Sequence, residues 1–345
     1  MATMRAGVFT GCGHIERRDL PMPEPAAGQV LLRVLGCGVC GTDYHIYEGE
    51  LTDGVVTPVV LGHEIAARVE RLGDSVSGLE AGQFCAVDPV IGCGTCRQCQ
   101  LGRPNLCRRP AIIGYKLNGG FAQYLVAPAS KVAPMGESAG VAGGVLCETL
   151  ACVLNGYSRL GLFAGASALV LGAGTVGLLW TQLLAQSPCR TVLVSEPVAM
   201  RRNKAAQLGA AEIIDPRSQD LAAQVRRRLP DGADFIIDAT GEPAAIEQAL
   251  PLLGPGGTFM IFGVCPAGSS IRLDPFELYN KQARIAASKM PPHQLPRAAA
   301  LIDAGRIACD QIVTATVGLD ELERRVREFT ARRDANVKIV VDPWI

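Results

Sequence analysis

Residues 167–180 read SALVLGAGTVGLLW, a short apolar run, a glycine-rich turn and a second apolar run with helical spacing. Gly172 permits a tight turn, Gly174 lets the backbone approach a pyrophosphate, and Gly177 allows close packing of the helix on the strand. The N-terminus of that helix faces the anion. The stretch therefore predicts a dinucleotide-binding loop, with glycines that only serve packing as the alternative. The candidate cofactor-binding residues of the loop are Gly172, Gly174, Thr175, Val176 and Gly177.

The residue that would select the cofactor ends the next apolar run. Glu196 closes TVLVSE at 191–196, about 20 residues beyond the loop. A carboxylate at this place hydrogen-bonds the ribose hydroxyls and repels a 2′-phosphate, which favours NAD. Arg201 and Arg202 weaken this preference because either guanidinium could bind an extra phosphate. NADP therefore remains an alternative cofactor.

Strands and helices alternate regularly on both sides of the loop. The short apolar runs that read as strands are 167–171, 191–195, 212–214, 234–238, 258–262 and 284–288. The longer segments between them have helical spacing. This alternation predicts a parallel sheet covered by helices on both faces, a doubly wound Rossmann domain over 153–292.

The rest of the chain has a different texture. Residues 1–152 alternate short apolar runs with Gly- and Pro-rich turns, which is typical of an irregular β-rich domain. In the tail, 319–333 predicts an amphipathic helix and 336–342 a strand. The apolar stripe of that helix consists of Leu319, Leu322, Val326 and Phe329. We expect the tail, 293–345, to fold back onto the first region and complete one domain of an α/β protein.

Composition excludes several classes of function. The chain has 345 residues, and its 33 lysines and arginines balance 33 aspartates and glutamates, so no basic surface for nucleic acid is implied. The longest apolar stretch, 168–185, is interrupted by glycines and polar residues and reads as a strand-turn-helix, not a membrane span. The first residues lack the apolar region of a signal peptide. We expect a soluble, cytoplasmic protein.

Thirteen cysteines are a high number, and four of them are clustered in CGTCRQCQLGRPNLC. The two-residue gaps let neighbouring thiolates converge on one ion, and the longer gap returns the chain to complete a tetrahedron. The spacing differs from that of ferredoxin iron–sulfur clusters, and disulfides or idle thiols are the alternative. The predicted structural zinc ligands are Cys93, Cys96, Cys99 and Cys107.

A second set of metal-binding residue types lies upstream. GVCGTDYHIYEG contains Cys40, Thr42, Asp43 and His45, and LGHE contains His63 and Glu64. In this order, followed by the four-cysteine loop and the dinucleotide unit, these stretches resemble the zinc-dependent medium-chain dehydrogenases over essentially the whole chain. The similarity points to the branch of polyol, sorbitol and threonine dehydrogenases.

The resemblance implies a fold and a second zinc site. It implies a GroES-like catalytic domain beside the Rossmann domain, and two Zn²⁺ ions per chain, one catalytic and one structural. Cys40 and His63 would bind the catalytic zinc, with Glu64 beside it as an alternating ligand or a neighbour of the ligands. Asp43 would hydrogen-bond the ring of His63 and fix its tautomer.

The last ligand of the catalytic zinc is sought in VLCETL, residues 145–150. Family members complete this site with a cysteine in ethanol-type enzymes, or with a glutamate in the polyol, sugar and threonine branch. Cys147 and Glu148 stand side by side here. The continuation ETLACVLNGY resembles the glutamate type, although Thr149 replaces its usual proline. We therefore expect Glu148 to be the ligand and Cys147 a buried neighbour.

The resemblance also implies the chemistry. Zinc would act as a Lewis acid that acidifies a bound alcohol, whose carbon can then release hydride to the nicotinamide. The hydroxyl of Thr42 would take the alcohol proton and pass it through the cofactor ribose towards His45 and solvent. An ordinary turn residue is the alternative reading of Thr42.

Several functions and partners stay open at this point. The glutamate-type site suggests oxidation of a secondary alcohol in a polyol, sugar, cyclitol or aminocyclitol. A threonine-type amino-alcohol dehydrogenase, an NADPH-dependent carbonyl reductase and a non-catalytic zinc- and nucleotide-binding protein are the alternatives. The family suggests a homotetramer, or else a dimer. Further candidates to face the small-molecule substrate are Glu48, Tyr115, Lys289 and His293.

Overall fold

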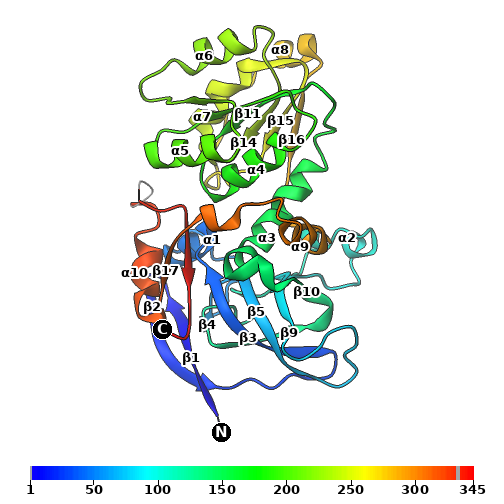
Figure 1. The fold of residues 1–345 in the computed structure, drawn as a ribbon, viewed down its shortest axis with the longest axis vertical. Helices are drawn as coiled ribbons and strands as arrows, with labels where there is room; N and C mark the ends of the chain where they lie inside the picture. Colours follow the sequence, from blue (N-terminus) through cyan, green and yellow to red (C-terminus); the bar gives the residue numbers. More distant parts are fainter. Residues whose placement is uncertain (1, 332–334) are drawn as a thin grey trace. The chain divides into compact units, whose positions relative to one another are not determined.

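The computed structural model describes residues 2–331 and 335–345, which form two compact units (Figure 1). Unit 1 comprises Met1–Ala151 and Met290–Ile345, and unit 2 comprises Cys152–Lys289. The first border lies one residue, and the second three residues, before the borders expected at 152/153 and 292/293.

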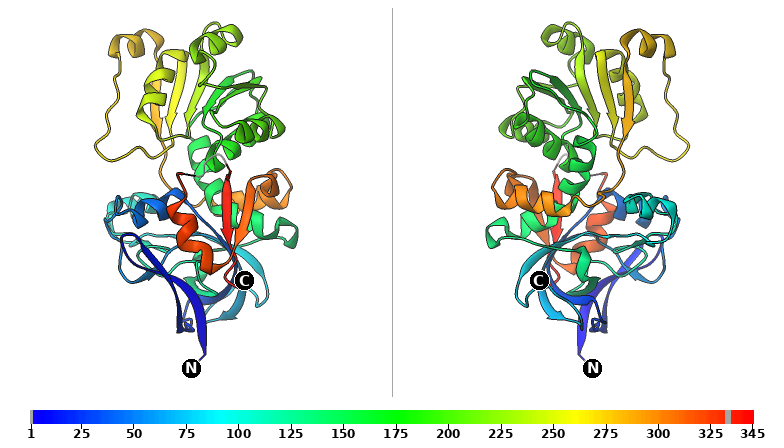
Figure 2. Two further views of the ribbon diagram at one scale, coloured as in Figure 1. Left: turned by 90° about the vertical axis from the view of Figure 1, so that its left-hand side faces the viewer. Right: turned by 90° about the vertical axis from the view of Figure 1, so that its right-hand side faces the viewer.

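Unit 2 is built on a six-stranded parallel sheet with the order β13-β12-β11-β14-β15-β16. Its strands are β11 (Ser167–Leu171), β12 (Thr191–Ser195), β13 (Glu212–Ile214), β14 (Ala233–Asp238), β15 (Leu253–Ile261) and β16 (Arg284–Ala287). Its helices are α4 (Thr175–Ala185), α5 (Ala199–Gln207), α6 (Leu221–Arg228), α7 (Pro243–Ala249) and α8 (Pro275–Lys281). Helices lie on both faces of the sheet (Figure 2). The doubly wound prediction is confirmed, and each predicted strand is present.

The strand order of unit 2 places its ligand-binding edge. The chain winds outward in one direction from β11 to β13 and in the other from β14 to β16, so the winding reverses between β11 and β14. In such sheets a ligand binds outside the carboxyl ends of the strands at this point. The segment 168–185 forms β11, the glycine turn and α4, as predicted.

Unit 1 is rich in β-structure. A seven-stranded sheet has the order β10-β6-β5-β3-β18-β17, with β9 also paired to β3; smaller sheets are β2-β1-β4 and β7-β8. The strands are β1 (Thr3–Gly11), β2 (His14–Pro21), β3 (Gln29–Gly38), β4 (Val59–Val60), β5 (Glu64–Leu72), β6 (Phe84–Val87), β7 (Val90–Ile91), β8 (Ala111–Ile112), β9 (Tyr124–Pro128), β10 (Val132–Pro134), β17 (Val313–Val317) and β18 (Lys338–Val341). The helices are α1 (Gly41–Tyr47), α2 (Arg97–Gln100), α3 (Gly140–Tyr157, which continues past the border at 151/152), α9 (Leu295–Asp303) and α10 (Leu322–Arg327).

The tail of the chain completes the large sheet of unit 1. Strand β18 pairs with the end of β3, opposite Gly38 and Cys37, and β17 pairs with β18. The expectation that the tail folds back onto the first region is confirmed. This pairing brings Lys338, at the start of β18, next to the segment that follows β3.

The predicted helix over 319–333 is wrong in its extent. A 3₁₀ turn at Leu319–Glu321 precedes α10, which ends at Arg327, and the predicted residues 332–334 lie outside the described residues. The helix ends because its apolar stripe ends: after Phe329 the next large apolar residue is Val337. The predicted strand 336–342 is confirmed in the shorter form Lys338–Val341.

One helical segment, Glu137–Tyr157, is long and apolar enough to cross a membrane by length and composition alone. Within the structure, 72% of the apolar 18-residue stretch of this segment is buried, and the core helix of a soluble protein passes the same test. It contains α3, which carries Cys147, Glu148 and Thr149.

Candidate metal centres and cofactor loop

The four clustered cysteines converge in unit 1. Cys93, Cys96, Cys99 and Cys107 lie around α2 and the following 3₁₀ turn, and their sulfurs all lie within 4.8 Å of one another. The Sγ of Cys96 lies 3.6 Å from that of Cys99 and 3.8 Å from that of Cys107. Four sulfurs at the usual zinc–sulfur distance stand about 3.8 Å apart in a tetrahedron. All thirteen cysteines lie within the described residues and are free thiols, so the disulfide alternative is not observed.

The surroundings of these sulfurs favour negative charge in part of the cluster. The Thr95 hydroxyl, followed by the backbone N–H groups of Cys96 and Thr95, lowers the pKa of Cys93 to about 5. Burial raises the pKa of Cys99 to about 12. Thiolate is the form that binds metal, and a cation is what lets four adjacent thiols ionise together. The arrangement fits a structural zinc site with no open position.

A second cluster forms where α1 and β5 of unit 1 meet. Cys40 stands at the N-terminus of α1, His63 precedes β5 and Glu64 begins it; their ligand atoms lie within 4.8 Å of one another. Gly62 has a φ of +90° and no room for a side chain, since a Cβ would lie 2.7 Å from the Sγ of Cys37. Glycine is therefore needed at 62 to turn His63 into the cluster.

Asp43 orients the histidine of this cluster. It is fully buried, and its Oδ2 accepts a hydrogen bond of 2.9 Å from the backbone N–H of Cys40. Its Oδ1 faces the Nδ1 of His63 at 3.8 Å, and neither atom has a hydrogen-bond partner among the described residues. Because Nδ1 faces the carboxylate, Nε2 is the nitrogen left for a metal.

The electrostatics of the cluster suit a cation. Burial lowers the pKa of His63, but Cys40, Asp43 and Glu148 outweigh it, so that this pKa lies well above its ordinary value. The charges around the ring therefore favour positive charge at this place, which suits a divalent ion. The donor set of thiolate, imidazole and carboxylate matches the ligands of catalytic zinc.

Cys147 and Glu148 lie on different sides of α3 and have different surroundings. The Sγ of Cys147 donates to the carbonyl of Leu295 at 3.7 Å, and its pKa is raised by burial and then by Cys309. Glu148, about 100° further around the helix, raises the pKa of His63. Glu148 does not join the tight group of three ligand atoms, but its charge acts on that group.

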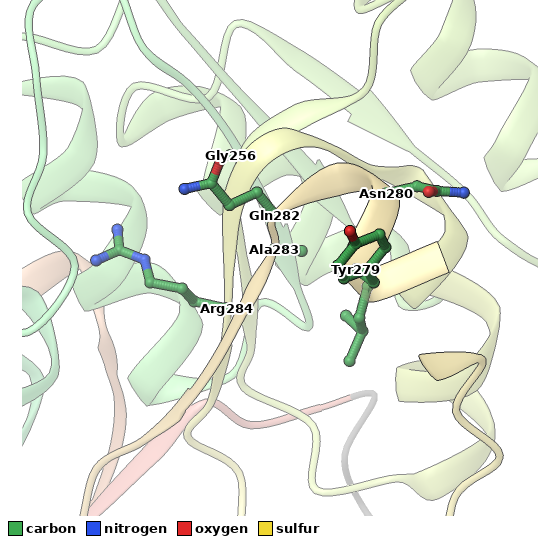
Figure 3. Close-up of a pocket in the computed structure, with 7 residues that line it drawn as sticks. Gly256, Tyr279, Asn280, Gln282, Ala283 and Arg284 are labelled. Atoms are coloured by element: carbon green, nitrogen blue, oxygen red, sulfur yellow. The ribbon is translucent and has the colours of Figure 1, made fainter. Parts of the chain in front are cut away.

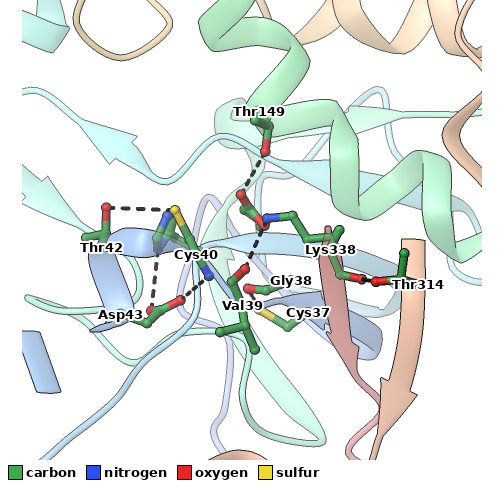
Figure 4. A network of polar contacts seen from close by, with 11 residues as sticks. Cys37, Gly38, Val39, Cys40, Thr42, Asp43, Thr149, Thr314 and Lys338 are labelled. Atoms are coloured by element: carbon green, nitrogen blue, oxygen red, sulfur yellow. Dashed lines mark hydrogen bonds and ion pairs between the residues drawn. The ribbon is translucent and has the colours of Figure 1, made fainter. Parts of the chain in front are cut away.

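The structure shows two partners of Glu64 that sequence reasoning missed (Figure 4). Thr149 donates to its Oε1 at 2.7 Å, and the Nζ of Lys338 pairs with its Oε2. Lys338 also donates to the carbonyl of Val39 at 3.1 Å. Burial alone lowers the pKa of Lys338, but Glu64 and Cys40 outweigh it and raise the pKa. The one feature of the sequence that could have indicated this partner is a lone lysine at the start of the apolar strand KIVVD.

The predicted proton-transfer residues both lie on α1. The Thr42 hydroxyl is 3.9 Å from the Sγ of Cys40, so it stands beside the metal cluster. His45 lies one turn further on, with 41% of its side chain exposed, and its Nδ1 lies 2.6 Å from the Oε2 of Glu50. Sequence reasoning missed Glu50, which no motif distinguishes.

The glycine-rich loop of unit 2 has the predicted local geometry. Gly172 has a φ of +88°, and a Cβ on Gly177 would lie 1.9 Å from the carbonyl oxygen of Gly172. At Gly174, which precedes the first residue of α4, the nearest atom to an added Cβ is the Nη1 of Arg201 at 3.8 Å. The first and third glycines are required by the fold, whereas the second leaves space above the loop.

The acidic residue after β12 is tied to this loop. Glu196 is buried; its Oε2 accepts from the N–H of Ala173 at 2.6 Å and its Oε1 from that of Val198 at 2.8 Å. Arg202 pairs with Asp215 at 3.0 Å and donates to the carbonyls of Glu196 and Pro197. Arg202, one of the two arginines that could bind a 2′-phosphate, is therefore already engaged in contacts at the end of β12.

Comparison with known proteins identifies the family. Residues 26–137 match the model of the alcohol dehydrogenase GroES-like domain, and residues 175–304 match that of the zinc-binding dehydrogenases. D-arabinitol dehydrogenase 1 of Uromyces fabae is 31% identical over 333 residues, covering 95% of this chain and 93% of the relative. The chain belongs to the zinc-dependent medium-chain dehydrogenases. It is therefore an enzyme that acts on alcohols.

Two further similarities refine this placement within the medium-chain dehydrogenases. L-threonine 3-dehydrogenase of Pyrococcus furiosus is 34% identical over 256 residues, covering 73% of each chain. The crystal structure of a zinc-binding dehydrogenase of Sinorhizobium meliloti, bound to NADP, has a TM-score of 0.96 at 34% identity and covers 99% of this chain and all of that one. The similarity to polyol and threonine dehydrogenases is confirmed, as is the combination of GroES-like and Rossmann-type domains.

The remaining substrate candidates lie in different surroundings. Burial, followed by Asp53 and Glu148, raises the pKa of Tyr115 to about 12. Glu48 directly follows α1 and is exposed, and His293 has a φ of +57°. Lys289 belongs to unit 2. The charge of Glu148 thus acts on Tyr115 as well as on His63.

Proposed function

We propose that this dehydrogenase uses NAD(H) and zinc to oxidise a secondary alcohol of a polyol, sugar, cyclitol or aminocyclitol to the ketone, or to catalyse the reverse reaction. The observation that carries the proposal is the convergence of half-buried Cys40 with buried His63 and Glu64 within 4.8 Å, on which Glu148 acts electrostatically. A medium-chain dehydrogenase with a glutamate at this place of α3 resembles the polyol branch, and an arabinitol dehydrogenase is among its relatives.

Named residues would hold the two metals. Cys40, His63 and Glu148 would bind the catalytic zinc, with Glu64 beside them, and the four-cysteine cluster would bind the structural one. A zinc ion held there would supply a Lewis acid that lowers the pKa of a bound alcohol. The nicotinamide, when bound, supplies the hydride acceptor.

The chain's own residues move the proton. Thr42, beside Cys40, has a hydroxyl that can accept the alcohol proton and donate its own. His45 has an exposed ring that can exchange a proton with water, while Glu50 holds its Nδ1. Asp43 moves no proton in this scheme; it keeps the ring of His63 oriented.

The cofactor preference follows from the residues after β12. The Glu196 carboxylate would meet the ribose, and Arg202 is engaged with Asp215, so NAD is preferred. Arg201, above Gly174, keeps NADP as the alternative, and the Sinorhizobium relative is bound to NADP. Measuring kcat/KM for both cofactors tests this. A Glu196→Gln variant should use NADP better than the parent enzyme does, whereas an NADP preference in the parent enzyme itself would contradict the proposal.

Metal analysis combined with a substrate panel tests the central proposal. We expect two zinc ions per chain, one of them lost together with activity in Glu148→Ala, and both retained in the control Cys147→Ser. The panel contains polyols, aminocyclitols, L-threonine and simple alcohols. If Cys147→Ser lost the metal instead, Cys147 would be the ligand and simple alcohols the leading substrates.

The same panel separates the alternatives. Preference for L-threonine would favour the amino-alcohol function suggested by the Pyrococcus relative. Faster reduction of ketones with NADPH would favour a carbonyl reductase.

We also propose that the enzyme assembles through unit 2, as a homotetramer or a dimer. Strand β16 is the last strand of its sheet, and apolar side chains around it are exposed. Those exposed by more than a third include Val264, Leu273, Phe276, Tyr279 and Ile285. Figure 3 shows an open hollow beside them, between α8 and the start of β16, whose lining contains no predicted metal or cofactor ligand. The variant Ile285→Lys places a charge on this edge, and we expect its oligomer to dissociate into single chains. Measuring the molar mass of parent and variant by light scattering tests this interface.

A further inference from the structure

A buried carboxylate ends β14 in unit 2. Asp238 has an exposed fraction of 0%, and its Oδ1 accepts hydrogen bonds from the N–H of Thr240 at 2.9 Å and from the Thr240 hydroxyl at 2.5 Å. The N–H of Gly241 lies 3.3 Å from each of its oxygens. A buried carboxylate is costly unless its oxygens are hydrogen-bonded. Asp238 therefore fixes the turn 238–241 that follows the strand.

This turn lies against the glycine-rich loop. The N–H of Ala239 donates to the carbonyl of Leu171, the last residue of β11, at 2.9 Å. A Cβ on Gly172 would lie 3.0 Å from the Cγ2 methyl group of Thr240. Gly172 begins the predicted dinucleotide loop, and the winding of the sheet reverses between β11 and β14. The turn 238–241 therefore flanks the place where such sheets bind their ligand.

The hydrogen bonds of Thr240 determine which of its groups faces that loop. Its hydroxyl donates to Asp238 and accepts from the N–H of Glu242 at 3.0 Å. The hydroxyl hydrogen is thus used within the turn, and the methyl group is the part of the side chain near Gly172. Without the acceptor on Asp238, the Thr240 side chain could turn to another staggered rotamer. Asp238 therefore controls the surface that the turn presents to the glycine-rich loop.

Asp238 also joins the next loop at the same edge of the sheet. Its carbonyl accepts from the N–H groups of Phe262 and Gly263, which follow β15, at 3.1 and 2.8 Å. A Cβ on Gly263 would lie 2.1 Å from the backbone nitrogen of Gly241 and 2.9 Å from the Oδ2 of Asp238. Glycine at 263 is needed for the two loops to pack this closely. The segments that follow β11, β14 and β15 are thus held together around one aspartate.

We propose that Asp238 is a positioning residue for the cofactor. It keeps the turn 238–241 in the conformation that, together with the glycine-rich loop, forms the walls of the dinucleotide site. The inference rests on the proposed function, because a dinucleotide has to be the ligand of that loop. Asp238 is fully buried, so it acts through Thr240 and Gly241. A site that already has its binding conformation binds more tightly, since less order has to be imposed on binding.

The test compares two aspartates of the same strand. Asp234, near the start of β14, accepts hydrogen bonds from the backbone N–H and the hydroxyl of Ser167 at 2.8 and 2.7 Å. It is the matched control, because it makes the same kinds of bond at the opposite end of the parallel strands. Asp238→Asn and Asp234→Asn are made in the full enzyme. The Kd for NADH is measured by fluorescence titration, and Tm is measured on the same samples.

We expect Asp238→Asn to weaken cofactor binding. The amide nitrogen of asparagine cannot accept a hydrogen bond, so the turn is held by fewer bonds. If the turn then has its binding conformation one tenth of the time, the Kd for NADH rises about tenfold. Asp234→Asn should leave this Kd unchanged, whatever its effect on Tm.

Two substitutions of Thr240 test the contact without changing a fully buried residue, since Thr240 is half-buried. Thr240→Val removes the hydroxyl that binds Asp238 and should raise the Kd for NADH. Thr240→Ser keeps the hydroxyl and should raise this Kd less. When Asp238→Asn and Thr240→Val are combined, their effects on the Kd should not multiply, because both remove the same contact.

Two results would overturn the inference in distinguishable ways. If Asp238→Asn lowered Tm but left the Kd for NADH at the parent value, or if Asp234→Asn raised that Kd equally, Asp238 would serve the fold alone while the proposed function stood. If the parent enzyme bound neither NADH nor NADPH, the proposed function would fail, and the inference with it.

Discussion

His63 Nδ1 and Asp43 Oδ1 face each other at 3.8 Å inside unit 1, and neither atom has a hydrogen-bond partner among the described residues. The second oxygen of Asp43 is fixed by the backbone N–H of Cys40. One aspartate thus positions two of the residues assigned to the catalytic metal. Burial raises the pKa of Asp43, whereas His63 and the Cys40 N–H act to lower it.

Replacing Asp43 should weaken the catalytic metal site. Asp43→Asn keeps the shape but removes the charge that orients and polarises the ring of His63. We expect the affinity for zinc at this site to fall by about 10- to 100-fold, with the structural zinc retained. Titration with a competing chelator measures it. Asp88→Asn is the control, since Asp88 is also buried but pairs with Lys131; an equal loss in both variants would contradict the assignment.

The residues whose convergence could be predicted from their spacing alone lie close together in the sequence. The four cysteines fall within 15 residues of chain, from Cys93 to Cys107, and their spacing alone fixes what they can bind. The partners of Glu64 could not be found in this way. Lys338 lies 274 residues away and reaches Glu64 only because β18 pairs with β3.

The fold was predictable where the pattern is regular. The strands of unit 2 are apolar almost throughout, because helices cover both faces of their sheet, and short apolar runs locate them well. The helix predicted over 319–333 was too long because the apolar stripe was extended beyond Phe329. Sequence periodicity says little about where a helix ends when no capping residue marks it.

Two glycines of the cofactor loop should respond differently to alanine. Gly177→Ala would place a Cβ 1.9 Å from the carbonyl of Gly172, so we expect it to destabilise unit 2 by about 1–3 kcal/mol. Gly174→Ala meets no atom closer than 3.8 Å and should leave Tm unchanged. Its methyl group would occupy space that the pyrophosphate needs, so the Kd for NAD should rise. Calorimetry and cofactor titration check both; a drop of Tm in Gly174→Ala would be inconsistent with the open loop.

The Arg68–Glu137 pair predicts a pH dependence of stability. Two hydrogen bonds of 2.6 and 2.7 Å join the guanidinium to the carboxylate, and Arg68 lowers the pKa of Glu137. Because the folded pKa is below the unfolded value, the pair stabilises the fold above about pH 4.3, and this is lost as the pH falls through the folded pKa. The difference in Tm between the parent and Glu137→Gln should therefore shrink from pH 7 to pH 3.5. Glu80→Gln, at an exposed glutamate, should show no such trend.

The contact of His45 with Glu50 should affect turnover modestly. The two side chains are 41% and 58% exposed, and an exposed ion pair contributes only about 0.2–1 kcal/mol, or at most about fivefold in rate. We expect Glu50→Gln to lower kcat within that range and to leave zinc content and the Kd for NAD unchanged. The reason is that its contact among the described residues is with His45, and not with a predicted zinc ligand or the cofactor loop. Glu48→Gln, at the exposed end of α1, is the control. A rise of the solvent deuterium isotope effect in Glu50→Gln alone would place Glu50 behind the proton-transfer step; an equal effect in both variants would leave His45 without a specific partner in catalysis.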